Sequence, residues 1–263
     1  MCTVSVIPLR VGRHSGGDGA GGDALGGFRL VHNRDELLSR PLAQSPRVRR
    51  FGDHQAIFPI DQPGGGTWVA ATDAGVAFAM LNVNHGHRVA GVDHRPSRGR
   101  IIPALLGCDD ALRAIERARQ IDAHAFAPFR LVIVDRSHWG EIYADGWDVT
   151  AVTKAFGVAP LLFTSSGLGD DLVERPRRAL FDEMIRKNAP SPRRQDEFHA
   201  HRWPDRPHLS VHMSRADART VSRTVVEVAS SAASGGGVTM HYRAADDDIA
   251  RSTQLHPRQL QPQ

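Results

Sequence analysis

The order of strand-like and helix-like runs along the chain constrains its fold more than any other feature of the sequence. Runs rich in β-branched, aromatic and aliphatic residues predict strands at 3–9, 28–32, 67–71, 76–82, 129–134, 139–144, 147–152, 208–213, 220–228 and 238–242. Helical periodicity is confined to 97–121, with a break around Gly107 and Cys108, and to 172–188. Strands linked mainly as hairpins, with helices in separate blocks, predict an α+β protein with mainly antiparallel sheets.

The length of 263 residues favours one substantial domain. We expect this domain to span 1–248, with a flexible glycine-rich loop at 12–27 and a frayed tail at 249–263. The polar, proline-punctuated stretch at 189–207 is expected to be a connector, and 47–50 a charged loop.

Composition narrows the classes of partner. The formal net charge is +4, and the basic residues are scattered among acidic ones, which argues against a nucleic-acid partner. The two cysteines are far apart in the sequence and form neither a disulfide framework nor a metal-binding pair, and the histidine pairs lack a carboxylate-flanked ligand pattern. No apolar run approaches the ~18 residues of a membrane span. We therefore expect a cytoplasmic protein with no metal and no membrane span; the sequence does not indicate its oligomeric state.

Cys2 stands directly after the initiator methionine, at the start of an apolar run. Removal of Met1 would leave Cys2 with both a thiol and a free α-amine. The thiol has a free pKa of ~8.5 and the α-amine one of ~7.7–8.0, so this residue can supply both nucleophile and base. The other interpretation is that a short residue begins a buried strand and only packs there.

The polar residues Asn33, Arg34, Asp35 and Glu36 follow the second predicted strand. A hairpin of the first two strands would bring Cys2 close to them. Arg34 can then stabilise a thiolate by its charge, and Asp35 can orient either the α-ammonium or the guanidinium, whereas Glu36 is expected in the following turn. A solvated turn is the alternative interpretation.

Asparagines end the apolar stretch FAMLNVN, and burial of a side-chain amide without hydrogen-bond partners would be costly there. The side-chain NH2 of Asn82 can donate to a developing oxyanion. Asn84 lies on the same strand face, so either amide can serve while the other caps a turn.

Five short stretches within residues 1–135 form a pattern that is typical of a known family. They are Met-Cys at the start, HNRDELLSRP, PIDQPGGGTWVAATDAGVAFAMLN, SRGRIIPALL and FRLVIVD. Their order and approximate spacing resemble those of the NRDE family, the group of the transport and Golgi organisation protein. That family is similar in turn to the N-terminal-nucleophile hydrolases of the choloylglycine hydrolase and penicillin V acylase type.

The resemblance implies a four-layer αββα sandwich with Cys2 as nucleophile, Arg34 and Asp35 as its partners, and Asn82 as oxyanion donor. It places Ser165 where those hydrolases have an amide. It leaves Arg219 and Arg223 as alternative C-terminal arginines of the site. The residues expected to bind substrate are Asn33, Asn84, Ser165 and Arg219.

Three functions follow as hypotheses. The first is a cysteine-dependent amidohydrolase that acts on a small non-peptide amide and needs no cofactor. The second, implied by the resemblance, is a non-catalytic carrier or chaperone of haem or another hydrophobic ligand such as a lipid. The third, a structural domain that binds a partner, leaves the polar cluster at 33–36 unexplained.

Overall fold

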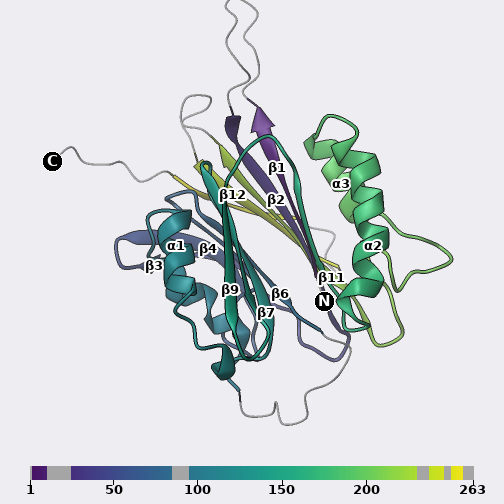
Figure 1. Ribbon diagram of the computed structural model, residues 1–263, viewed down its shortest axis with the longest axis horizontal. Coiled ribbons are helices and arrows are strands. Elements are labelled where there is room, and N and C mark those ends of the chain that lie inside the picture. Colours follow the sequence, from purple (N-terminus) through teal and green to yellow (C-terminus); the bar gives the residue numbers. More distant parts are fainter. Residues whose placement is uncertain (1, 11–24, 85–94, 230–236, 246–249, 257–263) are drawn as a thin grey trace, which may run out of the picture.

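Two antiparallel sheets lie face to face between two helical layers (Figure 1). The computed structural model describes residues 2–10, 25–84, 95–229, 237–245 and 250–256. Within these residues the first sheet has the strand order β10-β1-β2-β11-β12-β13 and the second has the order β3-β4-β5-β6-β7-β8-β9. Every pairing is antiparallel, so the predicted α+β class and the αββα sandwich are both confirmed.

The strands of the first sheet are, in spatial order, β10 (Leu161–Ser165), β1 (Cys2–Arg10), β2 (Leu25–Leu37), β11 (Ala218–Ala229), β12 (Gly237–Ala244) and β13 (Arg251–Leu255). Those of the second are β3 (Gln44–Phe51), β4 (His54–Ile60), β5 (Val69–Thr72), β6 (Ala77–Asn82), β7 (Phe129–Val134), β8 (His138–Ala144) and β9 (Val149–Ala155). The helices are α1 (Ala111–Ala118), α2 (Asp170–Phe181), its π-helical continuation η5 (Asp182–Arg186), α3 (Pro192–Ala200) and the 3-10 turns η2 (Arg98–Arg100), η3 (Ile102–Leu105) and η4 (Ala123–Ala125).

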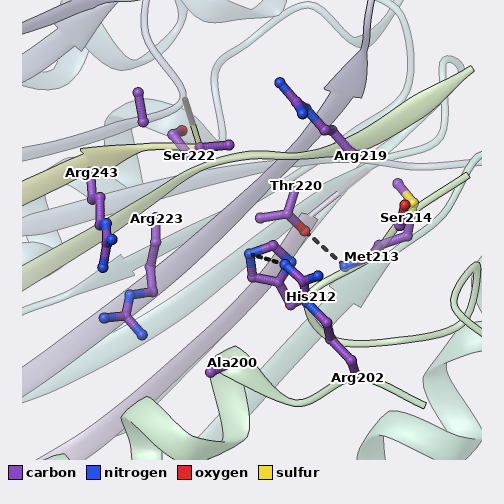
Figure 2. A pocket seen from close by; sticks show the side chains of 12 residues that line it. Ala200, Arg202, His212, Met213, Ser214, Arg219, Thr220, Ser222, Arg223 and Arg243 are labelled. Atoms are coloured by element: carbon purple, nitrogen blue, oxygen red, sulfur yellow. Dashed lines mark hydrogen bonds between the residues drawn. The ribbon is translucent and has the colours of Figure 1, made fainter. Parts of the chain in front are cut away.

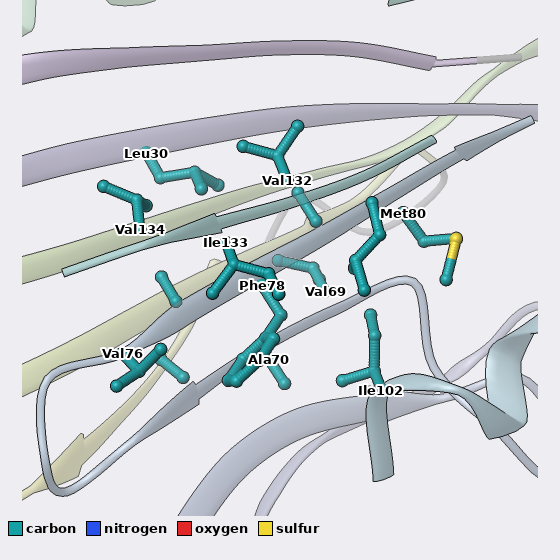
Figure 3. Close-up of a cluster of buried hydrophobic side chains, with 14 of the residues drawn as sticks. Leu30, Val69, Ala70, Val76, Phe78, Met80, Ile102, Val132, Ile133 and Val134 are labelled. Atoms are coloured by element: carbon teal, nitrogen blue, oxygen red, sulfur yellow. The ribbon is translucent and has the colours of Figure 1, made fainter. Parts of the chain in front are cut away.

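The main core lies between the sheets. Successive residues of a strand point to opposite faces, so Val4 and Val6 of β1 share one face and enter the same buried cluster. Leu30 of β2 and Val132 of β7 belong to this cluster too (Figure 3). Burial of one such side chain stabilises the fold by roughly 1.5–3 kcal/mol.

A second buried cluster lies between the first sheet and the helices α2 and α3. It contains Ile7, Leu162, Phe181, Ile185, Phe198 and Val211. The helix α1 covers the outer face of the second sheet, mainly at β8. In the described part of the chain, no helix has the length and apolar character needed to cross a membrane.

Several sequence predictions about single segments are wrong. The first sheet continues through 33–36, so Glu36 lies in β2 and not in a turn. Residues 47–50 belong to β3, an edge strand whose exposed arginines suit a sheet border. The expected connector contains α3, which Ser191 caps and Pro192 begins.

Other differences concern the C-terminal part and the first helical block. Residues 208–213 form turns and bends rather than a strand, and 251–255 form β13 rather than a frayed tail. In the block at 97–121, two 3-10 turns stand where the first helix was predicted. Of the glycine-rich stretch, 12–24 lie outside the described residues and 25–27 belong to β2.

Candidate active site

Cys2 and Arg34 face the same cavity between the two sheets. They are directly opposite in the β1–β2 pair, and the cavity beside them has a volume of about 190 Å3. The residues that line it are Cys2, Arg34, Asp35, Glu36, Arg40, Asp61, Thr67, Trp68, Met80, Asn82, Ser97, Arg98 and Gly99. The expected proximity of Cys2 to the polar cluster is therefore present.

Arg34 is fixed by two carboxylates and one aromatic ring. Its Nη2 donates to Oδ1 of Asp61 at 2.8 Å and to Oε2 of Glu36 at 3.3 Å, and its guanidinium lies 4.1 Å from the ring centroid of Trp68. Arg40 also donates to Asp61, from its Nε at 3.1 Å. Burial opposes ionisation of Asp61, but the bonds and charges of the two arginines hold its pKa below the ordinary value. The positive charge of Arg34 is thus balanced before any ligand enters.

Asp35 does not pair with Arg34, which corrects one of the two roles expected for its carboxylate. Neighbouring residues of a strand point to opposite faces, so the Asp35 carboxylate lies toward the helical layer. There Oδ1 accepts a bond from the hydroxyl of Thr220 at 2.6 Å, and Oδ2 is 4.0 Å from Nη2 of the buried Arg177. Burial raises the pKa of Asp35, while Arg177 and Thr220 act in the opposite direction.

The backbone nitrogen of Cys2 is held by a side chain of the neighbouring strand β10. It donates to Oγ of Ser165, which lies opposite Cys2 in β10, at 3.1 Å. Burial raises the pKa of the Cys2 thiol, the charge of Asp35 raises it further, and the charge of Arg34 opposes both effects. Burial thus disfavours the thiolate, and a base near the sulfur would assist its formation.

Of the two candidate amides, only Asn82 lines this cavity. Asn84 lies two residues past the end of β6, and its backbone N–H donates to Oδ2 of Asp170 at the start of α2. The candidate oxyanion donor that shares the cavity with Cys2 is thus Asn82.

Asn33 and Arg219 lie away from the Cys2 cavity. The amide of Asn33 donates to the carbonyls of His199 and Val211, at 2.8 and 3.0 Å, on the helical side of the sheet. Arg219 lines a different cavity, of about 480 Å3, which Arg223 also lines; Figure 2 shows the two side chains pointing away from each other. The structure does not bring either arginine to Cys2.

Sequence reasoning missed several lining residues, notably Asp61, Trp68 and Arg98. They lie near the point where the backbone at Gly66 passes close to the backbone at Gly99. Only glycine allows this approach, because a Cβ at Gly66 would lie 2.3 Å from the carbonyl oxygen of Gly99. The Thr67 N–H donates to that oxygen at 2.9 Å. The signal for these residues is the pair of glycine motifs GGGTW and SRGR, but neither motif reveals that the two segments meet. Across the described residues, no group of three or more His, Cys, Asp or Glu side chains could hold a metal ion.

Solved structures with a similar fold are hydrolases. The Caenorhabditis elegans N-acylethanolamine-hydrolyzing acid amidase ortholog superposes with a TM-score of 0.55 at 12% identity, covering 84% of this chain and 91% of that one. Penicillin V acylase from Agrobacterium tumefaciens gives a TM-score of 0.50 at 10% identity, covering 96% of this chain and 85% of that one. At such identities the likeness shows the fold alone, the sandwich of N-terminal-nucleophile hydrolases.

The sequence itself matches one family model. No curated protein matches the chain significantly. The family model described as Transport and Golgi organisation 2 matches residues 27–165, a little over half of the chain, and includes the 33–36 cluster and both glycine motifs. The chain therefore belongs to the Transport and Golgi organisation 2 family, the NRDE family, and has the sandwich fold of the N-terminal-nucleophile hydrolases.

Proposed function

We propose that the protein is a cysteine-dependent amidohydrolase that acts on a small, non-peptide amide. One observation carries the proposal: Cys2, whose backbone nitrogen is bonded to Ser165, lines a cavity that Arg34 and Asn82 also line. This combination offers a nucleophile, its base and a donor for an oxyanion within one small space.

Removal of Met1 turns the Cys2 nitrogen into an α-amine. This amine donates one N–H to Ser165 and keeps its lone pair, so it can take the proton of the thiol. The thiolate then attacks the carbonyl carbon of the amide, and the carbonyl oxygen becomes an oxyanion that the side-chain NH2 of Asn82 stabilises.

The α-ammonium next gives its proton to the leaving nitrogen, the C–N bond breaks, and the acyl group stays on the sulfur as a thioester. A water molecule, deprotonated by the α-amine, attacks this thioester and releases the carboxylic acid and the free thiol. Arg34 contributes a fixed positive charge beside the sulfur throughout.

The volume of the cavity favours a small substrate. At about 190 Å3 it is smaller than the ~300–1,000 Å3 of sites that enclose drug-sized ligands. A ligand as large as haem does not fit this volume without opening of the two sheets, so the cavity supports amide hydrolysis better than haem carriage.

The test begins with the N-terminus and the thiol. In a Cys108→Ala background, intact-mass spectra should show loss of Met1, and iodoacetamide should add once, at Cys2. A panel of short N-acyl amides should then be hydrolysed by this protein and not by its Cys2→Ala variant. Retention of Met1 in the purified protein, or amide turnover that survives Cys2→Ala, overturns the proposal.

A further inference from the structure

Arg98 differs from the other arginines of the Cys2 cavity in having no carboxylate partner. Its Nη1 donates to the carbonyl of Pro128 at 2.7 Å. No carboxylate of the described residues lies within 4.0 Å of its guanidinium, whereas Arg34 and Arg40 share Asp61 and Glu36. Among the described residues, Arg98 is therefore the arginine of this cavity whose charge no carboxylate balances.

The surroundings of Arg98 make this charge costly to keep. The side chain is half-buried, and burial lowers the pKa of Arg98, although the charges of Cys2 and Glu36 act to raise it. A partly desolvated guanidinium gains most from an anion that can accept two parallel hydrogen bonds. Since one side of Arg98 faces the cavity, that anion can come from a ligand.

The backbone that carries Arg98 is held in place. Ser97 accepts a bond from the N–H of Gly99 and begins the η2 turn, and the Gly99 carbonyl is bound by Thr67. The same crossing brings Gly66 so close that no side chain fits there. A guanidinium on such a turn is positioned before binding, which lowers the entropic cost of recognising an anion.

In the part of the chain that the structure describes, the other charges around the cavity are matched by opposite charges. Arg34 and Arg40 face Asp61 and Glu36, and Asp35 lies by Arg177 on the other face of the sheet. A neutral amide would leave Arg98 without a partner, whereas an amide that carries a carboxylate would complete the set.

We propose that Arg98 binds a carboxylate of the substrate, so that the site selects small amides that carry a carboxylate group. This inference rests on the proposed amide hydrolysis at Cys2. The planar fork of Arg98 matches a carboxylate better than the point charge of a lysine would. Arg98 is in this view a residue that determines specificity, since the bond that breaks is the amide and not a bond of the carboxylate.

The first experiment compares two alkylating probes that differ in charge. Iodoacetate carries a carboxylate and iodoacetamide does not, and both are small enough for the cavity. Rates of Cys2 alkylation are measured by intact mass in the Cys108→Ala background and divided by the rates with glutathione. After this normalisation, the alkylation rate with iodoacetate should be about ten times the rate with iodoacetamide. A factor of about ten is the effect of one charged hydrogen-bonded contact.

Arg98→Gln should bring this ratio close to one, because glutamine can keep a donor for the Pro128 carbonyl but has no charge. The matched control is Arg100→Gln, which removes an exposed arginine from the same turn and should leave the ratio unchanged. If Arg98→Gln slows both probes equally, Arg98 stabilises the thiolate or the fold, and the inference is wrong.

The second experiment needs no reactive thiol. Calorimetry with the Cys2→Ala variant should show that N-acetylglycine binds at least about tenfold more tightly than N-acetylglycinamide, and that adding Arg98→Gln removes this difference. Equal affinities overturn the carboxylate inference. Failure of both probes to label Cys2 counts instead against the proposed hydrolase, and the calorimetry then decides on Arg98 alone.

Discussion

Cys2 lies opposite Arg34 in the antiparallel pair of β1 and β2, and the two side chains leave the sheet on the same face. This pairing divides the 33–36 cluster into two sets. The side chains of Arg34 and Glu36 pair within the cavity, whereas those of Asn33 and Asp35 bond to His199, Val211 and Thr220, although Asp35 also contributes to the cavity lining. The cluster thus serves the candidate site and the attachment of the helical layer together.

The Asp35 carboxylate should depend on Thr220 for stability. Thr220→Val removes the hydroxyl that donates to Asp35 and that accepts from the Met213 N–H, and we expect a loss of about 1.5–3 kcal/mol in the free energy of unfolding. Urea denaturation measures it. Thr224→Val is the matched control on the same strand, because its buried hydroxyl has no hydrogen-bond partner among the described residues, and it should cost little. Equal losses in the two variants would contradict this role of Thr220.

Ser165 should position the α-amine of Cys2. Ser165→Ala removes the acceptor for the Cys2 nitrogen, and one lost hydrogen bond of about 1 kcal/mol corresponds to a roughly fivefold slower reaction. The decrease should appear both in amide turnover and in Cys2 alkylation near neutral pH, since both need the thiolate. Ser165→Asn places another acceptor there and should recover part of the rate. Unchanged rates in Ser165→Ala would remove Ser165 from the site.

Asn82 should act on the oxyanion and not on the thiol. Asn82→Ala is expected to lower kcat by about 10²–10³, the usual effect of removing one oxyanion donor. Alkylation by iodoacetamide forms no oxyanion, so its rate at Cys2 should stay within about twofold. A parallel fall in alkylation would show that Asn82 shapes the cavity instead.

His32 should make the fold less stable in acid. The ring is fully buried, and burial together with the charge of Arg34 lowers the pKa of His32 to about 3. The unfolded chain binds the proton near its ordinary pKa of ~6.5, so the stability is fully present above that pH and falls as the pH drops toward 3, by up to ~1.4 kcal/mol per pH unit.

His32→Leu removes this contribution. Urea unfolding at several pH values should show that the free energy of unfolding depends less steeply on pH between pH 6.5 and pH 4. Part of the dependence that remains comes from His199, because burial also holds the pKa of His199 well below the ordinary value. Near pH 7.5 the variant should be as stable as the parent or slightly more so, since neither ring nitrogen of His32 has a hydrogen-bond partner among the described residues. An unchanged pH dependence would contradict the prediction.

The elements that sequence reasoning missed share a physical cause. The strand β3 has an exposed, arginine-rich side, and Pro46 is its only buried residue, so its pattern looks like that of a charged loop. The helix α3 is strongly polar, although Ser191 and Pro192 are ordinary signals for a helix start. In both, attachment to a neighbouring element decides the structure more than the local apolar pattern does.

The sequence by itself determined the α+β class, the pairing of the first two strands, and the proximity of Cys2 to Arg34, because strand patterns and hairpins are local. It also determined the family, through motifs that lie in one stretch of chain. Only the tertiary structure decided that Asp61, Trp68 and Arg98 join Cys2, that Asp35 turns to the helical side, and that Asn82 rather than Asn84 faces the cavity. These facts depend on strand register and on the packing of one sheet against the other, which bring together residues that no local pattern relates.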